Sequence, residues 1–497
     1  MQYISTRGNY PPISALQAIV QGMVPRGGLF VPEAISHIDL TGLENLTYQE
    51  LAFEVLKPFL CSPGNYSEAE LKEYIQLAYN REKFDAETVT PLAFLEENLS
   101  ILELWHGPTA AFKDVALQLM PYLLTGASKK LGKRNEIVIL VATSGDTGKA
   151  ALEGFKNVPG IRIIVFYPDK GVSRIQELQM VTTDGKNTYV TGVKGNFDDC
   201  QNMVKEIFGN SSINALLNQK GFELSSANSI NWGRLVPQIV YYFWGYLEMV
   251  RKRIILSGDP VNVCVPTGNF GNILAGYYAK VMGLPINKLI CASNKNRVLA
   301  DFINTGIYDR RREFYRTSSP SMDILISSNL ERFLYEITSH NAIKINRWYK
   351  ELSRKGYFKV DDSTRQVLKN ILYGGFADEE ETLKEIKFVF EKYHYLIDPH
   401  TAVGMKVYRD YQRESGSNLP AFICSTASPF KFNLAVYRAL TGDDSVDDEF
   451  KVLEKLKEIS KQKIHRSLEG LDKLSINHNR TISVKEGFKE IKRILGI

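Results

Sequence analysis

The strongest constraint on the fold of this 497-residue chain is an alternation of short strand-like runs with longer helical patterns from residue 101 onward. The strand-like runs are 136–141, 161–166, 188–193, 261–265, 288–292 and 421–424. Such alternation builds βαβ units, in which parallel strands form a sheet covered by helices. The run at 137–141, Ile-Val-Ile-Leu-Val, is apolar throughout, as a strand buried on both faces requires. We therefore predict an α/β fold with largely parallel sheets.

The same patterns divide the chain into four predicted parts. Residues 1–97 are predicted to form a small helical N-terminal domain, because apolar residues recur at helical spacing in two segments. Residues 98–255 and 256–440 are predicted to form two α/β domains, the second with an insertion near 295–390. Residues 441–497 are predicted to form a helical tail, because Val452, Leu453, Leu456 and Ile459 fall on one helical face.

Composition argues against several classes of protein. With 61 basic and 56 acidic residues, the formal charge of +5 is too small to indicate nucleic-acid binding. The chain has no run of about 18 apolar residues and no secretory signal pattern at its start, so we expect no membrane partner. Its five cysteines lack CxxC spacing, which favours a reducing compartment and a cytoplasmic protein. The seven histidines form no clustered ligand set, so no metal site is predicted.

The segment 105–114, Trp-His-Gly-Pro-Thr-Ala-Ala-Phe-Lys-Asp, places Lys113 behind a rigid turn at the mouth of an apolar segment. Desolvation there would penalise the ammonium form and leave a nucleophilic amine. Such an amine can form a Schiff base with an aldehyde cofactor. The alternative is a lysine whose stem packs on the core while its charge reaches solvent.

A second motif, Gly268-Asn269-Phe270-Gly271-Asn272, follows the strand-like run at 261–265 and precedes a helical pattern. Backbone NH groups and the positive end of the helix would face a bound dianion, so this turn is typical of a phosphate cradle. An ordinary strand-to-helix turn is the alternative. A nucleotide-binding loop is excluded, because neither a Walker A pattern nor GxGxxG is present at the glycine-bearing turns.

Two further polar loops could bind anions. Thr143-Ser144-Gly145-Asp146-Thr147-Gly148 offers hydroxyl and NH groups that suit a carboxylate, or it forms a helix cap. Asn228-Ser229-Ile230-Asn231-Trp232-Gly233-Arg234 combines amide, hydroxyl and guanidinium donors, which suit a second anion. The alternative for the second loop is a polar helix entry with Arg234 exposed.

Together these segments resemble the threonine synthases, pyridoxal-phosphate enzymes that share a fold type with tryptophan synthase β chains and with serine and threonine dehydratases. The resemblance runs nearly end to end. It also rests on Tyr-Ile-Ser-Thr-Arg-Gly at 3–8, Gly-Gly-Leu-Phe-Val-Pro-Glu at 27–33, and the segments 226–232 and 425–427. It implies two helix-covered, largely parallel sheets of the tryptophan synthase β-like fold, with a small helical N-terminal domain.

The resemblance implies pyridoxal 5'-phosphate as the cofactor and Lys113 as its Schiff-base lysine. The residues implied to contact the cofactor are Phe112, Lys113, Asp146, Gly268, Asn269, Phe270, Gly271, Asn272 and Thr426. The residues implied to bind the substrate are Thr143, Ser144, Gly145, Thr147, Asn228, Ser229 and Arg234. The first three belong to the loop that holds the substrate carboxylate, Thr147 turns to the substrate phosphate, and the last three bind that phosphate. Asp146 stands where related enzymes often have Asn, so we expect it to face the cofactor or an amide. Ser428 stands where the family often has His.

The implied reaction converts O-phospho-L-homoserine and water to L-threonine and phosphate by β,γ-replacement, the last step of threonine biosynthesis. Such an enzyme is a lyase acting on phosphates, with a small-molecule substrate, and we expect a monomer or a homodimer. The first alternative is a threonine-synthase-like phospholyase that releases phosphate and a keto acid. A serine or threonine dehydratase and a non-enzymatic small-molecule sensor are weaker alternatives.

Overall fold

The computed structural model describes residues 1–25 and 27–497. Its largest sheet has six strands in the order β14-β11-β10-β15-β5-β4. These strands are β14 (Leu372–Phe376), β11 (Ile286–Ser293), β10 (Val261–Pro266), β15 (Ala421–Ser425), β5 (Leu99–Glu103) and β4 (Leu92–Glu96). All neighbours pair in parallel except β4 and β5, which are antiparallel.

The second large sheet has five strands in the order β16-β8-β7-β6-β9, all parallel. They are β16 (Arg480–Ser483), β8 (Thr188–Lys194), β7 (Ile161–Pro168), β6 (Glu136–Ala142) and β9 (Phe222–Ser225). The prediction of an α/β fold with two largely parallel sheets is therefore confirmed. Two smaller sheets are antiparallel, β2-β1-β3 and β12-β13.

Strand β6 shows why the sequence is apolar at every position. Val138 and Leu140 belong to a cluster with Met203 of α7 (Phe197–Gly209) and Ile491 of α20 (Gly487–Leu495). The alternate residues, such as Ile139, belong to the main core that includes helix α5 (Asp146–Phe155). Because successive strand residues point to opposite faces, helices on both faces require an apolar residue at each position.

Residues 1–97 contain helices α1 (Ala15–Gln21), α2 (Tyr48–Leu60) and α3 (Glu68–Ala78). They also contain a small sheet that the sequence analysis did not anticipate, formed by β1 (Gln2–Ser5), β2 (Ile13–Ser14) and β3 (Phe30–Pro32). Strand β4, at the end of this segment, pairs with β5 across the predicted boundary at 97/98. The division into four domains therefore stays a prediction.

The remaining helices lie around the two large sheets. Between β5 and β10 these are α4 (Lys113–Lys130), α6 (Arg174–Val181), α8 (Ser211–Gln219), α9 (Trp232–Leu235) and α10 (Ile239–Arg251). After β10 come α11 (Gly271–Val281), α12 (Val298–Thr305), α13 (Leu330–Ile337), α14 (Ala342–Lys355), α15 (Asp362–Ile371), α16 (Glu379–Tyr393) and α17 (Pro399–Ser415). Helix α17 packs against β10, β11, β14 and β15, so it covers the middle of the six-stranded sheet.

The segment near 295–390, predicted as an insertion, contributes strand β14 to the six-stranded sheet. It also contains the short antiparallel pair β12 (Ile307–Asp309) and β13 (Tyr357–Lys359), and the single turn η3 (Pro320–Met322). A methyl group added at Gly268 would lie 2.9 Å from the Ser321 carbonyl oxygen. The segment therefore reaches the loop that follows β10.

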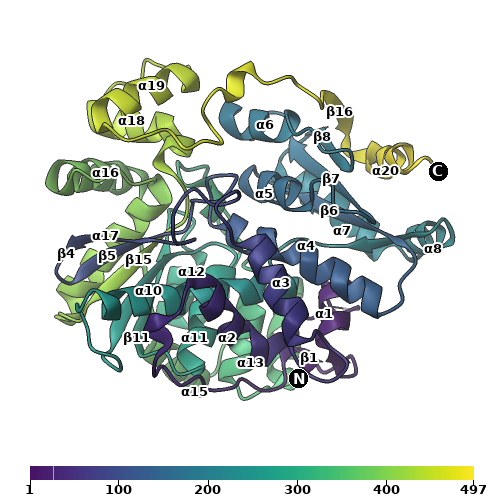
Figure 1. The fold of residues 1–497 in the computed structure, drawn as a ribbon, viewed down its shortest axis with the longest axis horizontal. Helices are drawn as coiled ribbons and strands as arrows, with labels where there is room; N and C mark the ends of the chain where they lie inside the picture. The colour runs from purple at the N-terminus through teal and green to yellow at the C-terminus, as the bar shows by residue number, and fades with distance from the viewer. Residues whose placement is uncertain (26) are drawn as a thin grey trace.

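The C-terminal segment begins with α18 (Asn433–Thr441) and α19 (Glu449–Ser460), and then crosses to the five-stranded sheet (Figure 1). Val452, Leu453 and Leu456 are buried as predicted, whereas Ile459 is 38% exposed. The tail is not only helical, because β16 pairs with β8 and α20 packs on α7. Within the described part of the chain, no helix is long and apolar enough to cross a membrane.

Candidate active site

The polar loops predicted from sequence meet in one cavity of about 1040 Å³. These loops follow the carboxyl ends of β6, β9, β10 and β15, the edge where α/β sheets bind ligands. The predicted residues that line the cavity are Phe112, Lys113, Thr143, Ser144, Asp146, Thr147, Asn228, Ser229, Arg234, Gly268, Asn269, Phe270, Gly271, Asn272 and Thr426. Gly145 is the predicted residue that does not line it. It lies beside the cavity at the start of α5, with φ 130°.

Lys113 is the first residue of α4, and its position is fixed by the turn before it. The buried Asp114 carboxylate accepts hydrogen bonds from the Thr109 amide and hydroxyl, both at 2.8 Å. The Phe112 amide donates to the Thr426 carbonyl at 2.9 Å, which ties the turn to the end of β15. The rigid turn inferred from the sequence is therefore present, and it directs Lys113 toward the cavity.

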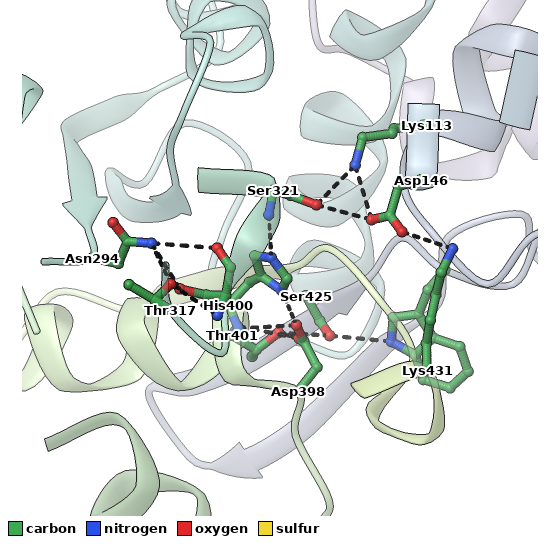
Figure 2. A network of polar contacts seen from close by, with 12 residues as sticks. Lys113, Asp146, Asn294, Thr317, Ser321, Asp398, His400, Thr401, Ser425 and Lys431 are labelled. Carbon is green, nitrogen blue, oxygen red and sulfur yellow. Dashed lines mark hydrogen bonds and ion pairs between the residues drawn. The ribbon is translucent and has the colours of Figure 1, made fainter. Parts of the chain in front are cut away.

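The Lys113 amine donates to Asp146 Oδ2 at 3.1 Å and to Ser321 Oγ at 3.2 Å (Figure 2). Its side chain is only 10% exposed. Burial lowers the pKa of Lys113, and the positive charges of Lys431 and Arg234 lower it further, although Asp146 opposes the shift. A lysine with a lowered pKa supplies the neutral amine that a nucleophile requires.

Asp146 lies between two lysines. Its Oδ1 atom is 2.9 Å from Lys431 Nζ and accepts from Gln176 Nε2 at 2.9 Å, and its Oδ2 atom accepts from Ser321 Oγ at 2.9 Å. Burial alone would raise the pKa of Asp146, but the neighbouring lysines Lys113 and Lys431, together with the hydrogen bond from Gln176, hold it well below its usual value. The carboxylate therefore stays charged, and its contacts are lysines, an amide and a hydroxyl.

The loop 268–272 has the features of an anion cradle. Phe270 adopts a left-handed conformation, with φ 62°, immediately before α11 begins at Gly271. Asn272 Oδ1 accepts from the Tyr241 and Tyr242 hydroxyls, both at 2.6 Å, while its Nδ2 group is buried with no partner among the described residues. A buried donor without an acceptor is costly. The NH groups of this helix start, with Asn272 Nδ2, fit a phosphate dianion.

A second group of polar donors lies on the loop before α9 and in α9 itself, which contains Arg234. Arg234 is only 3% exposed, so the alternative of an exposed arginine is wrong. Its Nη1 atom donates to the Ala227 carbonyl at 2.9 Å, and its Nε atom has no partner in residues 1–25 and 27–497. Burial lowers the pKa of Arg234 to about 10. A buried guanidinium with a free donor on a cavity wall suits an anionic group.

The loop after β6 is shaped by one hydroxyl. Thr143 Oγ1 accepts from the Gly145 amide at 3.0 Å and from the Gly148 amide at 2.9 Å. The Thr143 hydroxyl thus holds the start of α5, whereas the resemblance implied that Thr143 binds the substrate.

Three residues of the site were missed from the sequence, namely Ser321, His400 and Lys431. Ser321 lies in η3, and His400 Nε2 accepts from its amide at 3.1 Å. His400 Nδ1 is 2.6 Å from Asp398 Oδ2, and both side chains are at most 1% exposed (Figure 2). The Asp398-Pro399 start of α17 is a helix-capping signal that could have drawn attention to His400.

Comparison with known proteins places this site in a family. The model described as Threonine synthase N terminus matches residues 2–79, that of Pyridoxal-phosphate dependent enzyme matches 83–421, and that of Threonine synthase, C-terminal matches 401–473. The threonine synthase of Saccharomyces cerevisiae is 39% identical over 488 residues, which cover 92% of this chain and 93% of that protein. The chain belongs to the threonine synthase family. The cofactor of this family of enzymes is pyridoxal phosphate.

The solved structures agree with this family membership. The pyridoxal-phosphate-bound threonine synthase from Brucella melitensis has a TM-score of 0.87 and 34% identity, covering 100% of this chain and 99% of that one. The yeast threonine synthase structure also has a TM-score of 0.87, with 35% identity and the same coverage. Threonine synthase-like 1 of Homo sapiens is 41% identical, and the match covers 88% of this chain but only 60% of that relative's length.

Proposed function

We propose that this family member is a threonine synthase, which converts O-phospho-L-homoserine and water to L-threonine and phosphate. The observation that carries the proposal is that one cavity brings a buried lysine together with two sets of anion-binding donors, at 268–272 and at Arg234. A phosphorylated cofactor and a phosphorylated substrate need two such sets, whereas a dehydratase, whose substrate carries no phosphate, needs only the set that holds the cofactor phosphate. The phosphohomoserine substrate, the cytoplasmic location and a monomeric or homodimeric state belong to the same proposal.

The described residues fit pyridoxal phosphate. Residues Gly268, Asn269, Phe270, Gly271 and Asn272 would hold its phosphate, because Asn272 Nδ2 is a buried donor that lacks an acceptor within the described part of the chain. Lys113 would hold the aldehyde carbon of the cofactor, and Phe112 and Thr426 would contact its ring. Asp146 would act on the cofactor through its hydrogen bond with Lys113. When bound, the cofactor supplies an electron sink for charge that develops on the substrate carbon.

The protein's own groups would bind, orient and move protons. Ser144, in the loop shaped by Thr143, would bind the substrate carboxylate, and Thr147 would approach the substrate phosphate. Gly145 lies outside the cavity and donates its amide to Thr143 Oγ1, so it would shape the loop rather than contact the substrate. Asn228, Ser229 and Arg234 would bind the substrate phosphate. Lys113, with its lowered pKa, would accept the proton from the substrate Cα atom as a general base. Burial of these groups in the cavity would limit the access of stray water.

The second candidate is a phospholyase that releases phosphate and a keto acid. The 41% identity to threonine synthase-like 1 of Homo sapiens supports this second candidate. Both candidate reactions use the same lysine and the same anion sites. They differ in what becomes of the carbon skeleton after phosphate is released.

The test is incubation of the purified protein, loaded with pyridoxal phosphate, with O-phospho-L-homoserine. Phosphate release is measured together with proton NMR of the products. Threonine in equal amount to phosphate supports the synthase, and phosphate with a keto acid supports the phospholyase. If no phosphate is released, both candidate functions are overturned. Borohydride reduction and peptide mapping should find the cofactor on Lys113, and its attachment elsewhere would contradict the assignment.

A further inference from the structure

Lys431 is a buried lysine to which the proposed mechanism gives no task. It lies in the single turn η4 (Pro429–Phe432), directly after β15, and its side chain is 0% exposed. Its Nζ atom is 2.9 Å from Asp146 Oδ1 and donates to the Thr109 carbonyl at 2.9 Å. Unlike Lys113, it does not line the cavity. Lys431 therefore contacts one carboxylate oxygen of Asp146, while Lys113 contacts the other.

The charges of this cluster do not cancel if both lysines are protonated. One carboxylate, Asp146, would then face two ammonium groups, and the Arg234 charge also acts on Lys113. Excess positive charge in a buried site is unfavourable, and loss of one proton removes it. One of the two lysines is thus expected to be neutral.

The contacts decide which lysine keeps its proton. Lys431 has a carboxylate oxygen and a carbonyl oxygen, both at 2.9 Å, and no contact with solvent. Lys113 has a carboxylate oxygen at 3.1 Å and the Ser321 hydroxyl at 3.2 Å, and Ser321 itself donates to Asp146 (Figure 2). Two strong acceptors favour the ammonium form at Lys431.

We propose that Lys431 is the permanent cationic partner of Asp146 and thereby leaves Lys113 as the neutral, nucleophilic amine of the site. The proposal rests on the proposed role of Lys113. Lys431 acts through Asp146, so it is a positioning residue. Without Lys431, Asp146 would bind Lys113 as an ordinary ion pair and hold its proton.

The titration of the two lysines depends on the ionisable groups that surround them. The groups that act on Lys113 are Asp146 of α5, Lys431 of η4 and Arg234 of α9. Lys431 interacts electrostatically with Asp146, with Asp114 of α4 and with His465 of the C-terminal segment. The test variants change Lys431 and leave these other groups in place, so a shift in the pKa of Lys113 reports the charge of Lys431.

The first experiment measures the titration of Lys113 in the full-length protein after cofactor removal. Competitive acetylation between pH 6 and 11, read by mass spectrometry of the Lys113 peptide, gives its pKa. In Lys431→Met we expect this pKa to rise by about one unit or more, as loss of a neighbouring like charge requires. Lys431→Arg should stay close to wild type.

The matched control is Lys149→Met. Lys149 is also a buried lysine on the Asp146 helix, but it pairs with Glu153 and Thr183. An unchanged Lys113 pKa in folded Lys431→Met, or an equal shift in Lys149→Met, would overturn the proposal.

If Lys431→Met does not fold, lysine-selective ¹⁵N NMR of the wild-type protein decides the question. The Lys431 signal is assigned by its loss in Lys431→Arg. An ammonium signal at pH 8 supports the proposal, and a neutral amine overturns it. Failure of the synthase proposal can be told apart from failure of this one. The synthase proposal fails if no threonine is formed, whatever the pKa of Lys113 is.

Discussion

Arg234 is the residue on which the proposed choice of a phosphorylated substrate most directly depends. Replacing it with Met removes a buried charge and a free donor from the cavity wall. Loss of a charged hydrogen bond of this kind costs about 3 kcal/mol, or about a 100-fold lower kcat/KM for O-phospho-L-homoserine. The measurement is steady-state phosphate release.

The control for this variant is Arg409→Met on α17. Arg409 pairs with Glu385 at 3.0 Å and is not among the cavity residues. We expect its kcat/KM to stay within about threefold of wild type. A similar loss in both variants, or none in Arg234→Met, would contradict the assignment of Arg234 to the substrate phosphate.

His106, in the turn before Lys113, gives a prediction about pH. Its ring nitrogens lie 2.6 Å from Asp85 Oδ1 and 2.6 Å from Glu103 Oε2. Burial alone would lower the pKa of His106, but the two carboxylates raise it from 6.5 to about 9. Because the folded pKa is the higher one, the stabilisation is fully present below pH 6.5 and is lost as the pH rises through 9.

His106→Gln should therefore lower the thermal midpoint at pH 6, by the equivalent of about 3 kcal/mol, and have little effect at pH 10. Thermal unfolding of both proteins across this pH range measures the difference. A difference of the same size at pH 6 and pH 10 would show that the ion pairs are not its cause.

At the scale of elements, the C-terminal helix α20 completes the second apolar cluster. Ile491 is 0% exposed and packs in that cluster with Met203 and Val138. Ile491→Ala should lower the free energy of unfolding by about 2–4 kcal/mol, because it leaves a cavity in a packed core. The control Ile343→Ala removes a side chain that is 83% exposed, and we expect a change within about 0.5 kcal/mol. Equal thermal midpoints for the two variants would contradict the packing role of α20.

The elements also show what the sequence could predict. The run at 136–141 became β6 and the run at 161–166 became β7, because buried parallel strands have a strong local signature. Strands β1, β2 and β3 were missed because they have only 4, 2 and 3 residues. Strand β16 was missed because its partner β8 lies far away in the sequence: Arg480 pairs with Thr191, 289 residues earlier.

The same contrast holds in the site. The glycine-bearing loop 268–272 was found because its spacing after a strand is itself the signal. Lys431 and Ser321 were missed because burial and charge pairing arise only when distant segments meet, and a buried lysine looks like an exposed one in sequence.

For the whole molecule, the cofactor should bind both halves of the structure together. Asp146 follows β6 of the five-stranded sheet, and the loop 268–272 and Thr426 follow strands of the six-stranded sheet. Lys113 begins α4, which lies in the chain between β5 of the six-stranded sheet and β6 of the five-stranded sheet. Removing pyridoxal phosphate should lower the thermal midpoint, and adding it back at about 100 times its Kd should restore about 2.7 kcal/mol. Pyridoxal without the phosphate is the control, and it should restore much less. Equal rescue by both would show that the 268–272 loop does not hold the phosphate.

The order of strands in the two sheets has a consequence for synthesis on the ribosome. Strand β15 lies between β10 and β5, although residues 421–425 are made long after both of its neighbours. Strand β16, at residues 480–483, closes the edge of a sheet whose other members end at residue 225. Neither sheet is therefore complete until nearly the whole chain has emerged. The nascent protein must carry open strand edges through most of its translation, which makes it a natural client for chaperones.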